Sequence, residues 1–238
     1  MALFDHRGMN AVPAVPEAES DPEALFHDVI ASGWLRLIVP KGLGGEGASV
    51  AEVAEALRHL ARRHPAAGWV AWAQGLAVEA LVRSPNVAVR ETVLPDLLDG
   101  TRAGAVSWAP ECGLALPPKP VQATPLDRGW HLQGRLEQVF NLQWPGYVVL
   151  CPVWFVPVPQ GAPELRWTLL RSEEDSLRAD MDRKSPLRRQ AACGDLHLER
   201  VYFREDELLA DDAMTLRTPL SVLDQAMRAA LWAGNLMK

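Results

Sequence analysis

One glycine-rich stretch has the spacing of a dinucleotide-binding loop. Residues 42–47 read Gly-Leu-Gly-Gly-Glu-Gly and lie between a short apolar segment and an expected helix. That fingerprint also requires a strand–helix–strand unit and an acidic residue about twenty positions further on. Residues 65–69 contain no acid, and a second helical segment stands where the second strand would be. We therefore interpret the stretch as a tight turn that leads into a capped helix.

The histidines and cysteines lack the spacing of a metal site or an activated nucleophile. His59 and His64 are five residues apart, which does not place them on one helical face, whereas His131 and His197 are single residues on expected strands. The chain has no HExxH, GxSxG or phosphate-loop motif. An odd number of widely spaced cysteines predicts reduced, mostly buried thiols. These are Cys112, Cys151 and Cys193. We expect no metal site and assign no catalytic residue.

Composition excludes several classes of function. The chain has 238 residues and a net charge of −6 at pH 7, so charge gives no argument for binding nucleic acid or an anionic membrane. The N-terminus has no cationic start followed by an apolar core, so no signal peptide is evident. The longest apolar stretch, residues 66–82, is interrupted by Gln74 and Glu79 and predicts a buried helix. We expect a cytoplasmic protein.

The element pattern divides the chain in two. The first hundred residues are predicted to be helical, with a capping box at Ser49 and Glu52, and with Glu55 placed to pair with Arg58. The helix behind that cap is expected to bury Val50, Val53, Leu57, Leu60 and Ala61. Other helices are expected from Pro22 to Gly33, over 66–83, and from Val87 to a break at Pro95 with a last turn ending at Gly100.

Strands are predicted next, over residues 103–109, 119–124, 130–141, 147–158, 165–171 and 194–203. Residues 172–192 are highly charged and predict a solvated loop. Helices followed by antiparallel strands indicate an α+β chain rather than alternating strand–helix units. We expect a helical domain over 1–102, a β-barrel domain over 103–212, and the start of a truncated helical bundle over 213–238.

The terminal segment is expected to form a helix in need of neighbours. Thr218 is a suitable N-cap, and Pro219 fits the first helical position, where its missing N–H is harmless. Beyond them the segment is apolar on most faces, with a narrow polar stripe made by Asp224, Gln225 and Arg228. A helix that is apolar on most faces is normally buried by neighbouring elements on most faces. We predict a homo-oligomer or a partner subunit that packs on helix 219–237.

Several collinear motifs resemble the acyl-CoA dehydrogenase family. The N-terminal ones are Gly33-Trp34, Val39-Pro40, residues 44–49 (Gly-Gly-Glu-Gly-Ala-Ser) and residues 60–65 (Leu-Ala-Arg-Arg-His-Pro), which run into Trp69 and Trp72. Residues 129–134 (Gly-Trp-His-Leu-Gln-Gly) are similar to the family's strand that enters the flavin site. Residues 196–203 (Leu-His-Leu-Glu-Arg-Val-Tyr-Phe) are similar to the strand that closes its middle domain. The resemblance covers about residues 20–238.

The resemblance implies a helical N-terminal domain, a β-barrel middle domain and a C-terminal four-helix bundle. It implies FAD between barrel and bundle, with an acyl thioester against the flavin. The cofactor-binding positions that it implies are Val106, Ser107, Trp108 and Asn141.

The sequence departs from the family at two places. Gln138, Val139 and Phe140 stand where the family usually has the Trp, Ile and Thr of the stretch that packs on and hydrogen-bonds the flavin. In the preceding loop, residues 108–114, only Pro110 and Gly113 match. The family's bundle supplies the carboxylate base and an arginine for the pyrophosphate of the partner's FAD, and no residue of this chain is matched to either role.

Two hypotheses follow. The first is an acyl-CoA dehydrogenase-like flavoprotein, an FAD-dependent oxidoreductase that oxidises a CH–CH bond of an acyl thioester. It would be incomplete in this chain and would need a bundle supplied by another chain. A related flavin-dependent monooxygenase component is a variant of it. The second is a non-catalytic, degenerate homologue or partner subunit.

Overall fold

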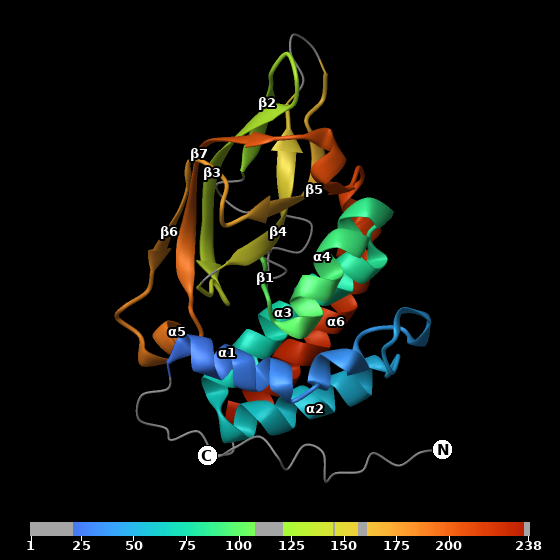
Figure 1. The fold of residues 1–238 in the computed structure, drawn as a ribbon, viewed down its shortest axis with the longest axis vertical. Helices are drawn as coiled ribbons and strands as arrows, with labels where there is room; N and C mark the ends of the chain where they lie inside the picture. Colours follow the sequence, from blue (N-terminus) through green and yellow to red (C-terminus); the bar gives the residue numbers. More distant parts are fainter. Residues whose placement is uncertain (1–20, 108–120, 145, 157–160, 236–238) are drawn as a thin grey trace.

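The computed structural model describes residues 21–107, 121–144, 146–156 and 161–235. Helices gather at one end of the molecule and a sheet forms the other, with α3, α4 and α6 running between them (Figure 1). Buried side chains of both parts form one continuous hydrophobic core. The α+β class is confirmed. Among the described helices, none is both long enough and apolar enough to cross a bilayer.

The helices follow the expected order. Their bounds are α1 Pro22–Ala31, η2 Trp34–Leu37, η3 Lys41–Leu43, α2 Val50–Arg63, α3 Pro65–Arg83, α4 Val87–Asp99, α5 Pro186–Gln190, η5 Glu205–Glu207 and α6 Ala213–Asn235. The glycine-rich stretch is the turn around η3, where Gly44 and Gly47 take left-handed φ angles of 85° and 59°.

The capping box of α2 is confirmed. The Glu52 amide donates to Ser49 Oγ at 3.3 Å, and the Ser49 amide donates to Glu52 Oε2 at 2.8 Å. The expected pair is also present, because Arg58 Nε donates to Glu55 at 2.9 Å. One expected core position is wrong: Val50 is 38% exposed. It lies in the first turn, so the buried face of α2 begins at Val53.

The burial expected for α3 is confirmed, whereas the break expected in α4 is wrong. Helix α3 is buried along most of its length, as its apolar sequence predicts. Helix α4 does not break at Pro95 but continues to Asp99, and Gly100 ends it at a left-handed φ of 81°. A proline removes only its own N–H from the helical ladder, and the bonds on either side hold the helix together.

The sheet is open and mixed, which corrects the expected antiparallel barrel. Its strands are β1 Ala103–Val106, β2 Gln122–Pro125, β3 Trp130–Val139, β4 Tyr147–Phe155, β5 Glu164–Arg171, β6 Leu177–Met181, β7 Gly194–Phe203 and β8 Leu208–Ala210. Their order is β6-β7-β3-β2-β4-β5-β8, and β1 and β2 both lie parallel to β4. Parallel neighbours need a long crossover, which the chain between β1 and β4 provides. Among the described residues, no ladder joins β6 to β8.

The expected loop over 172–192 contains β6 and α5. Strand β6 is an edge strand whose central residues are exposed, and only its ends, Leu177 and Met181, are half-buried. A short polar edge strand lacks the apolar alternation that identifies strands in sequence. The short strand β8 escaped detection as well.

Helix α6 begins six residues earlier than expected. It starts at Ala213, so Pro219 lies inside the helix and Thr218 is not its cap. The cap is Asp212, whose Oδ1 accepts from the Met214 amide at 3.1 Å. The helix packs closely on α2 and α3, because a Cβ on Gly68 of α3 would lie 2.8 Å from both Ala61 of α2 and Leu231 of α6.

A buried amide network joins α3, α4 and the sheet. Gln74 is fully buried and donates to the Leu97 carbonyl at 2.8 Å. Its Oε1 accepts from the Gly104 amide at 2.6 Å and from Asn141 Nδ2 at 2.7 Å. Asn141 also donates to the Gly104 carbonyl at 3.0 Å and accepts from Gln143 at 3.2 Å. One glutamine side chain therefore connects α3 to α4, to β1 and to the segment after β3.

We predict that Gln74→Leu lowers the free energy of unfolding by about 3 kcal/mol or more. It leaves the Leu97 carbonyl, the Gly104 amide and the Asn141 amide without their partner, and each loss costs about 1–3 kcal/mol. Urea unfolding measures the change. The matched control is Gln133→Leu on the exposed face of β3, expected within about 0.5 kcal/mol of wild type. Equal effects of the two substitutions would contradict the network's role.

We also predict that Gly68→Ala destabilises the protein by about 1–3 kcal/mol, because the new methyl group overlaps Ala61 and Leu231. Thermal unfolding followed by circular dichroism measures this. At Gly42 a Cβ meets nothing within 4 Å, so Gly42→Ala is the control and should be nearly neutral. A stable Gly68→Ala protein would show that α2, α3 and α6 are packed less tightly than described.

Candidate functional site

Three aromatic rings meet where α3 reaches the end of β3. Trp69 and Trp72 lie three residues apart on α3 and therefore share a face. Phe140 follows β3 directly, and its ring stacks on Trp69 with centroids 4.7 Å apart and an interplanar angle of 13°. Trp72 meets both other rings edge-on, with centroids at 5.4 Å and 6.0 Å. We call Trp69, Trp72 and Phe140 the aromatic cluster.

Helix α6 brings an aspartate and an arginine to this cluster. Trp72 Nε1 donates to Asp224 Oδ1 at 2.7 Å, and Arg228 Nε donates to the same oxygen at 3.0 Å. The Arg228 guanidinium lies 5.0 Å from the centroid of Trp72, within the range of a cation–π interaction. Asp224 is 1% exposed, and its second oxygen, Oδ2, has no hydrogen-bond partner.

The backbone at the end of β3 sets the direction of Phe140. The pairing of β3 with β7 shifts register between Leu136 and Val139, and Gln138 takes a left-handed φ of 53°. Asp195 of β7 holds this irregular segment, because its Oδ1 accepts from the Gln138 amide at 2.8 Å and it also binds Arg135. Asn141 follows Phe140 with a φ of 69°. Left-handed residues on either side thus turn the Phe140 ring toward α3.

The cluster leaves part of its aromatic surface accessible. Trp69 and Phe140 are only half-buried, whereas Trp72, which meets both rings edge-on, is buried. Stacking on aromatic faces contributes about 0.5–1.5 kcal/mol per ring beyond the burial of area. Apolar rings beside a few fixed polar groups are the usual lining of a small-molecule site.

The expected cofactor-binding residues lie on the neighbouring strands. Val106 is the buried last residue of β1, and Ser107 is half-buried with its amide donating to the Leu150 carbonyl at 3.0 Å. Asn141 is fully buried, and its side-chain amide is engaged by Gln74, Gly104 and Gln143. Trp108 lies outside the described residues. The structure therefore places the Asn141 side chain in the buried amide network, and the role of all four positions in cofactor binding stays a prediction.

Sequence reasoning missed most of this site. Trp69 and Trp72 stood out only as part of the family resemblance and Phe140 only as a departure from it. Asp224 and Arg228 were interpreted as part of a polar stripe. The polar stripe was the available signal. Asp224 and Arg228 lie four residues apart on an otherwise apolar helix, and both contact Trp72 of the neighbouring helix α3.

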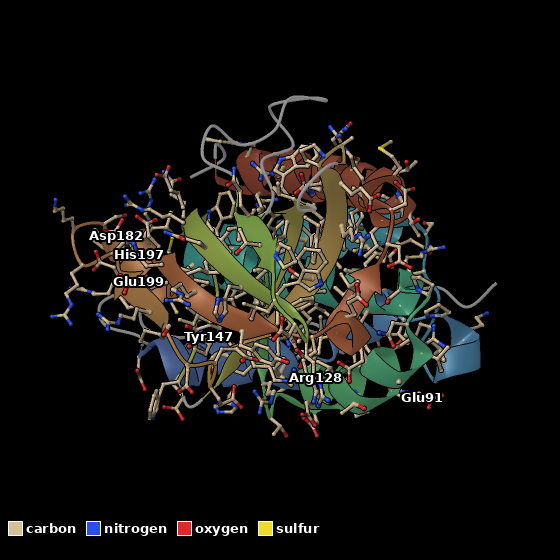
Figure 2. The ribbon with its side chains drawn as sticks, turned by 90° about the horizontal axis from the view of Figure 1, so that it is seen from above. Glu91, Arg128, Tyr147, Asp182, His197 and Glu199 are labelled. Atoms are coloured by element: carbon tan, nitrogen blue, oxygen red, sulfur yellow. The ribbon has the colours of Figure 1, made fainter. Side chains whose placement is uncertain are left out.

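Other chemically capable groups do not form a site in the described part of the chain. Burial raises the pKa of both Cys151 and Cys193 to about 11, which keeps these thiols protonated and unreactive. Asp182, His197 and Glu199 are labelled on the side of β6 and β7 in Figure 2, but they are separated along the strands, because the Asp182 amide donates to the Cys193 carbonyl whereas His197 pairs with Arg178. Among the described residues, no three His, Cys, Asp or Glu side chains are grouped to hold a metal ion.

Comparison with known proteins gives consistent matches. Residues 4–101 match the family "Acyl-CoA dehydrogenase, N-terminal domain". A benzylmalonyl-CoA dehydrogenase of Aromatoleum aromaticum is 29% identical over 133 residues, which is 55% of this chain and 35% of that protein. Two solved structures share the fold. Butyryl-CoA dehydrogenase from Megasphaera elsdenii aligns with a TM-score of 0.70 and 17% identity. The alignment covers 98% of this chain and 58% of the butyryl-CoA dehydrogenase chain. The FAD complex of PigA aligns with a TM-score of 0.74 and 15% identity, and the alignment covers 91% of this chain and 57% of the PigA chain.

This chain spans about a third of the length of the curated relative and somewhat more than half of the two solved structures. The matched family, the curated relative and the shared fold agree with one another. They support the acyl-CoA dehydrogenase family, whose N-terminal domain is matched by residues 4–101 and whose fold the described part of the chain shares.

Proposed function

We propose that this chain is part of an FAD-dependent oxidoreductase that acts on an acyl thioester by oxidising a CH–CH bond. The aromatic cluster carries the proposal, because it offers half-buried rings for a flat cofactor at the junction of α3, α6 and β3. The relatives support it: one is a dehydrogenase of a CoA ester, and another has been solved with FAD.

The residues present fit the ring system of FAD. Trp69 and Phe140 stack on each other, so the flavin ring would lie against the outer face of one of them. When bound, FAD supplies the acceptor for a hydride from the acyl chain. The protein's task is to orient this ring and to keep water away, which the buried Trp72 and the half-buried Trp69 and Phe140 would do.

We further propose that additional helices complete a bundle around α6. The exposed face of α6 contains Thr218, Val222, Gln225, Ala229 and Trp232, spaced four, three, four and three residues apart. This is the seam of a helix that packs along another helix at a shallow angle. Val222 is 57% exposed and Trp232 is 63% exposed, and the seam has no charged residue. The residue that removes the substrate's α-proton would come from this bundle.

The domain division at 1–102, 103–212 and 213–238 is part of the same proposal. So is a cytoplasmic location, where Cys151 and Cys193 stay reduced.

A non-catalytic relative or partner subunit is the second candidate. It is favoured by Asn141, whose side-chain amide is fully occupied inside the protein, and by Phe140, which has no polar group to offer a cofactor. A monooxygenase would keep the flavin and differ in its substrate.

The first test is FAD binding. Purified protein titrated with FAD should gain visible flavin absorbance and lose tryptophan fluorescence, because stacked flavin quenches Trp69 and Trp72. Trp69→Leu should weaken binding by about 3–10-fold. Trp144→Leu is the matched control, since Trp144 lies near Phe140 in sequence but is 80% exposed.

A protein that stays colourless with excess FAD would overturn the enzyme proposal and support the non-catalytic candidate. With flavin bound and the bundle complete, acyl-CoA should bleach the flavin without oxygen if the activity is dehydrogenation. Oxygen consumption with insertion of one oxygen atom into a substrate would instead identify a monooxygenase.

The second test is association through α6. Analytical ultracentrifugation should show species larger than the monomer, and Val222→Lys should shift them toward the monomer by placing a charge in the seam. Val87→Lys is the control, because Val87 is similarly exposed, at 48%, on α4. A monodisperse wild-type monomer that binds no partner would contradict the proposed bundle.

A further inference from the structure

Strand β6 ends the sheet on one side. It is the outermost strand in the order of the sheet, and it lies at the sheet's margin in Figure 1. Its ladder with β7 is flanked by two bonds, in which the Glu199 amide donates to the Ser176 carbonyl and the Asp182 amide donates to the Cys193 carbonyl. Both bonds use even-numbered residues of the β6 segment, so the backbone groups of its even-numbered residues point toward β7.

The odd-numbered residues of β6 point their backbone groups the other way, because these groups alternate along an antiparallel strand. The outer edge therefore presents the amide and carbonyl of Ala179, the amide of Met181 and the carbonyl of Leu177. The Leu177 amide is used locally, since it donates to the Glu174 carbonyl. Among the described residues, no strand pairs with this edge. Such a row of backbone groups is a template for a further strand.

The side chains of β6 divide by face. Leu177 and Met181 are half-buried at the rim of the hydrophobic core. Arg178 and Asp180 are exposed, and neither forms an ion pair in the described part of the chain. Asp195, which lies opposite Asp180 on β7, already has an arginine partner. The edge thus carries one cation and one anion without partners, and two apolar side chains that are only half covered.

This edge is complementary to itself. If a second copy of β6 runs antiparallel with Ala179 opposite Ala179, each Arg178 faces the Asp180 of the other copy and each Leu177 faces the Met181. Ala179 exchanges both of its hydrogen bonds with its counterpart, and the Met181 amide donates to the Leu177 carbonyl of the other copy. Arg178 and Asp180 then form non-hydrogen-bonded pairs, in which the side chains of an antiparallel ladder lie closest together.

Charge selects this register. The adjacent registers of the same edge place Arg178 opposite Arg178, or Asp180 opposite Asp180, and like charges directly opposed are destabilising. An edge with charges of one sign would repel its own copy in every register. One cation and one anion at these positions attract the copy in the single register that also joins Leu177 to Met181.

We propose that β6 is a dimerisation edge, at which the sheets of two copies of this chain join into one antiparallel sheet about a twofold axis at Ala179. Each residue of one copy contacts the partner residue of the other and the reverse, as an interface between identical surfaces requires. The edge is separate from the seam of α6 and does not depend on the proposed function. A strand of 5 residues buries little area, so we expect a weak, concentration-dependent dimer.

Reversing one charge at a time tests the edge. Every chain compared, including the parent, carries Val222→Lys, so that the remaining association does not use the α6 seam. Arg178→Asp leaves two acids on the edge and Asp180→Arg leaves two arginines, so each variant opposes like charges to its own copy. Analytical ultracentrifugation over a range of concentrations should show that each raises the dissociation constant about tenfold or more. Arg128→Asp, an exposed change in the turn between β2 and β3, is the control and should keep the parent value.

The two variants should bind each other. An equimolar mixture of Arg178→Asp and Asp180→Arg again places an acid opposite an arginine in both pairs, so dimers should return with about the parent affinity. The chain with both substitutions should likewise pair with itself. A loss of folding stability cannot produce the rescue in the mixture, because each chain there still carries its own substitution.

Two results would overturn the dimerisation edge. One is a parent chain that stays monomeric up to its highest soluble concentration. The other is a mixture of the two variants that associates no better than either variant alone. Neither result touches the proposals for FAD and for α6, because flavin absorbance and the comparison of Val222→Lys with wild type test those separately.

Discussion

The buried amide of Gln74 is the interaction on which the arrangement of the molecule depends. Helices and sheet could share a hydrophobic core in many relative positions, because apolar contact has no direction. Gln74 donates to the Leu97 carbonyl and accepts from Gly104 and Asn141, and these directional bonds favour one relative position. They fix the depth of α3 against β1 and, through Asn141, the place where the chain leaves β3. Phe140 precedes Asn141, so the same network sets the distance between Phe140 and Trp69.

Helix α6 places a second constraint on the position of α3. It lies antiparallel to α3, since Leu231 adjoins Gly68 while Asp224 binds Trp72. Small residues make this approach possible, and the aspartate sets the register along the helix. Trp72 is therefore held from two sides, by Asp224 of α6 and by the ring of Phe140, and the site is assembled from three segments that are distant in sequence.

The sequence predicted what depends on local chemistry. The capping box at Ser49, the buried α3 and the end of α4 at Gly100 are set by neighbouring residues, and all are confirmed. The open sheet, the polar edge strand β6 and the early start of α6 depend on pairing between distant segments, and these were missed. The site falls in the second group, because nothing near Trp72 in sequence indicates that Asp224 will bind its indole.

The bond between Trp72 and Asp224 joins residues 152 positions apart, with the whole sheet between them. During synthesis on the ribosome, α3 emerges long before α6, and its tryptophan face remains uncovered while every strand is made. A helix this apolar is a target for chaperones and for premature aggregation during that interval. The contact between Trp72 and Asp224 can therefore form only after every strand of the sheet has been synthesised.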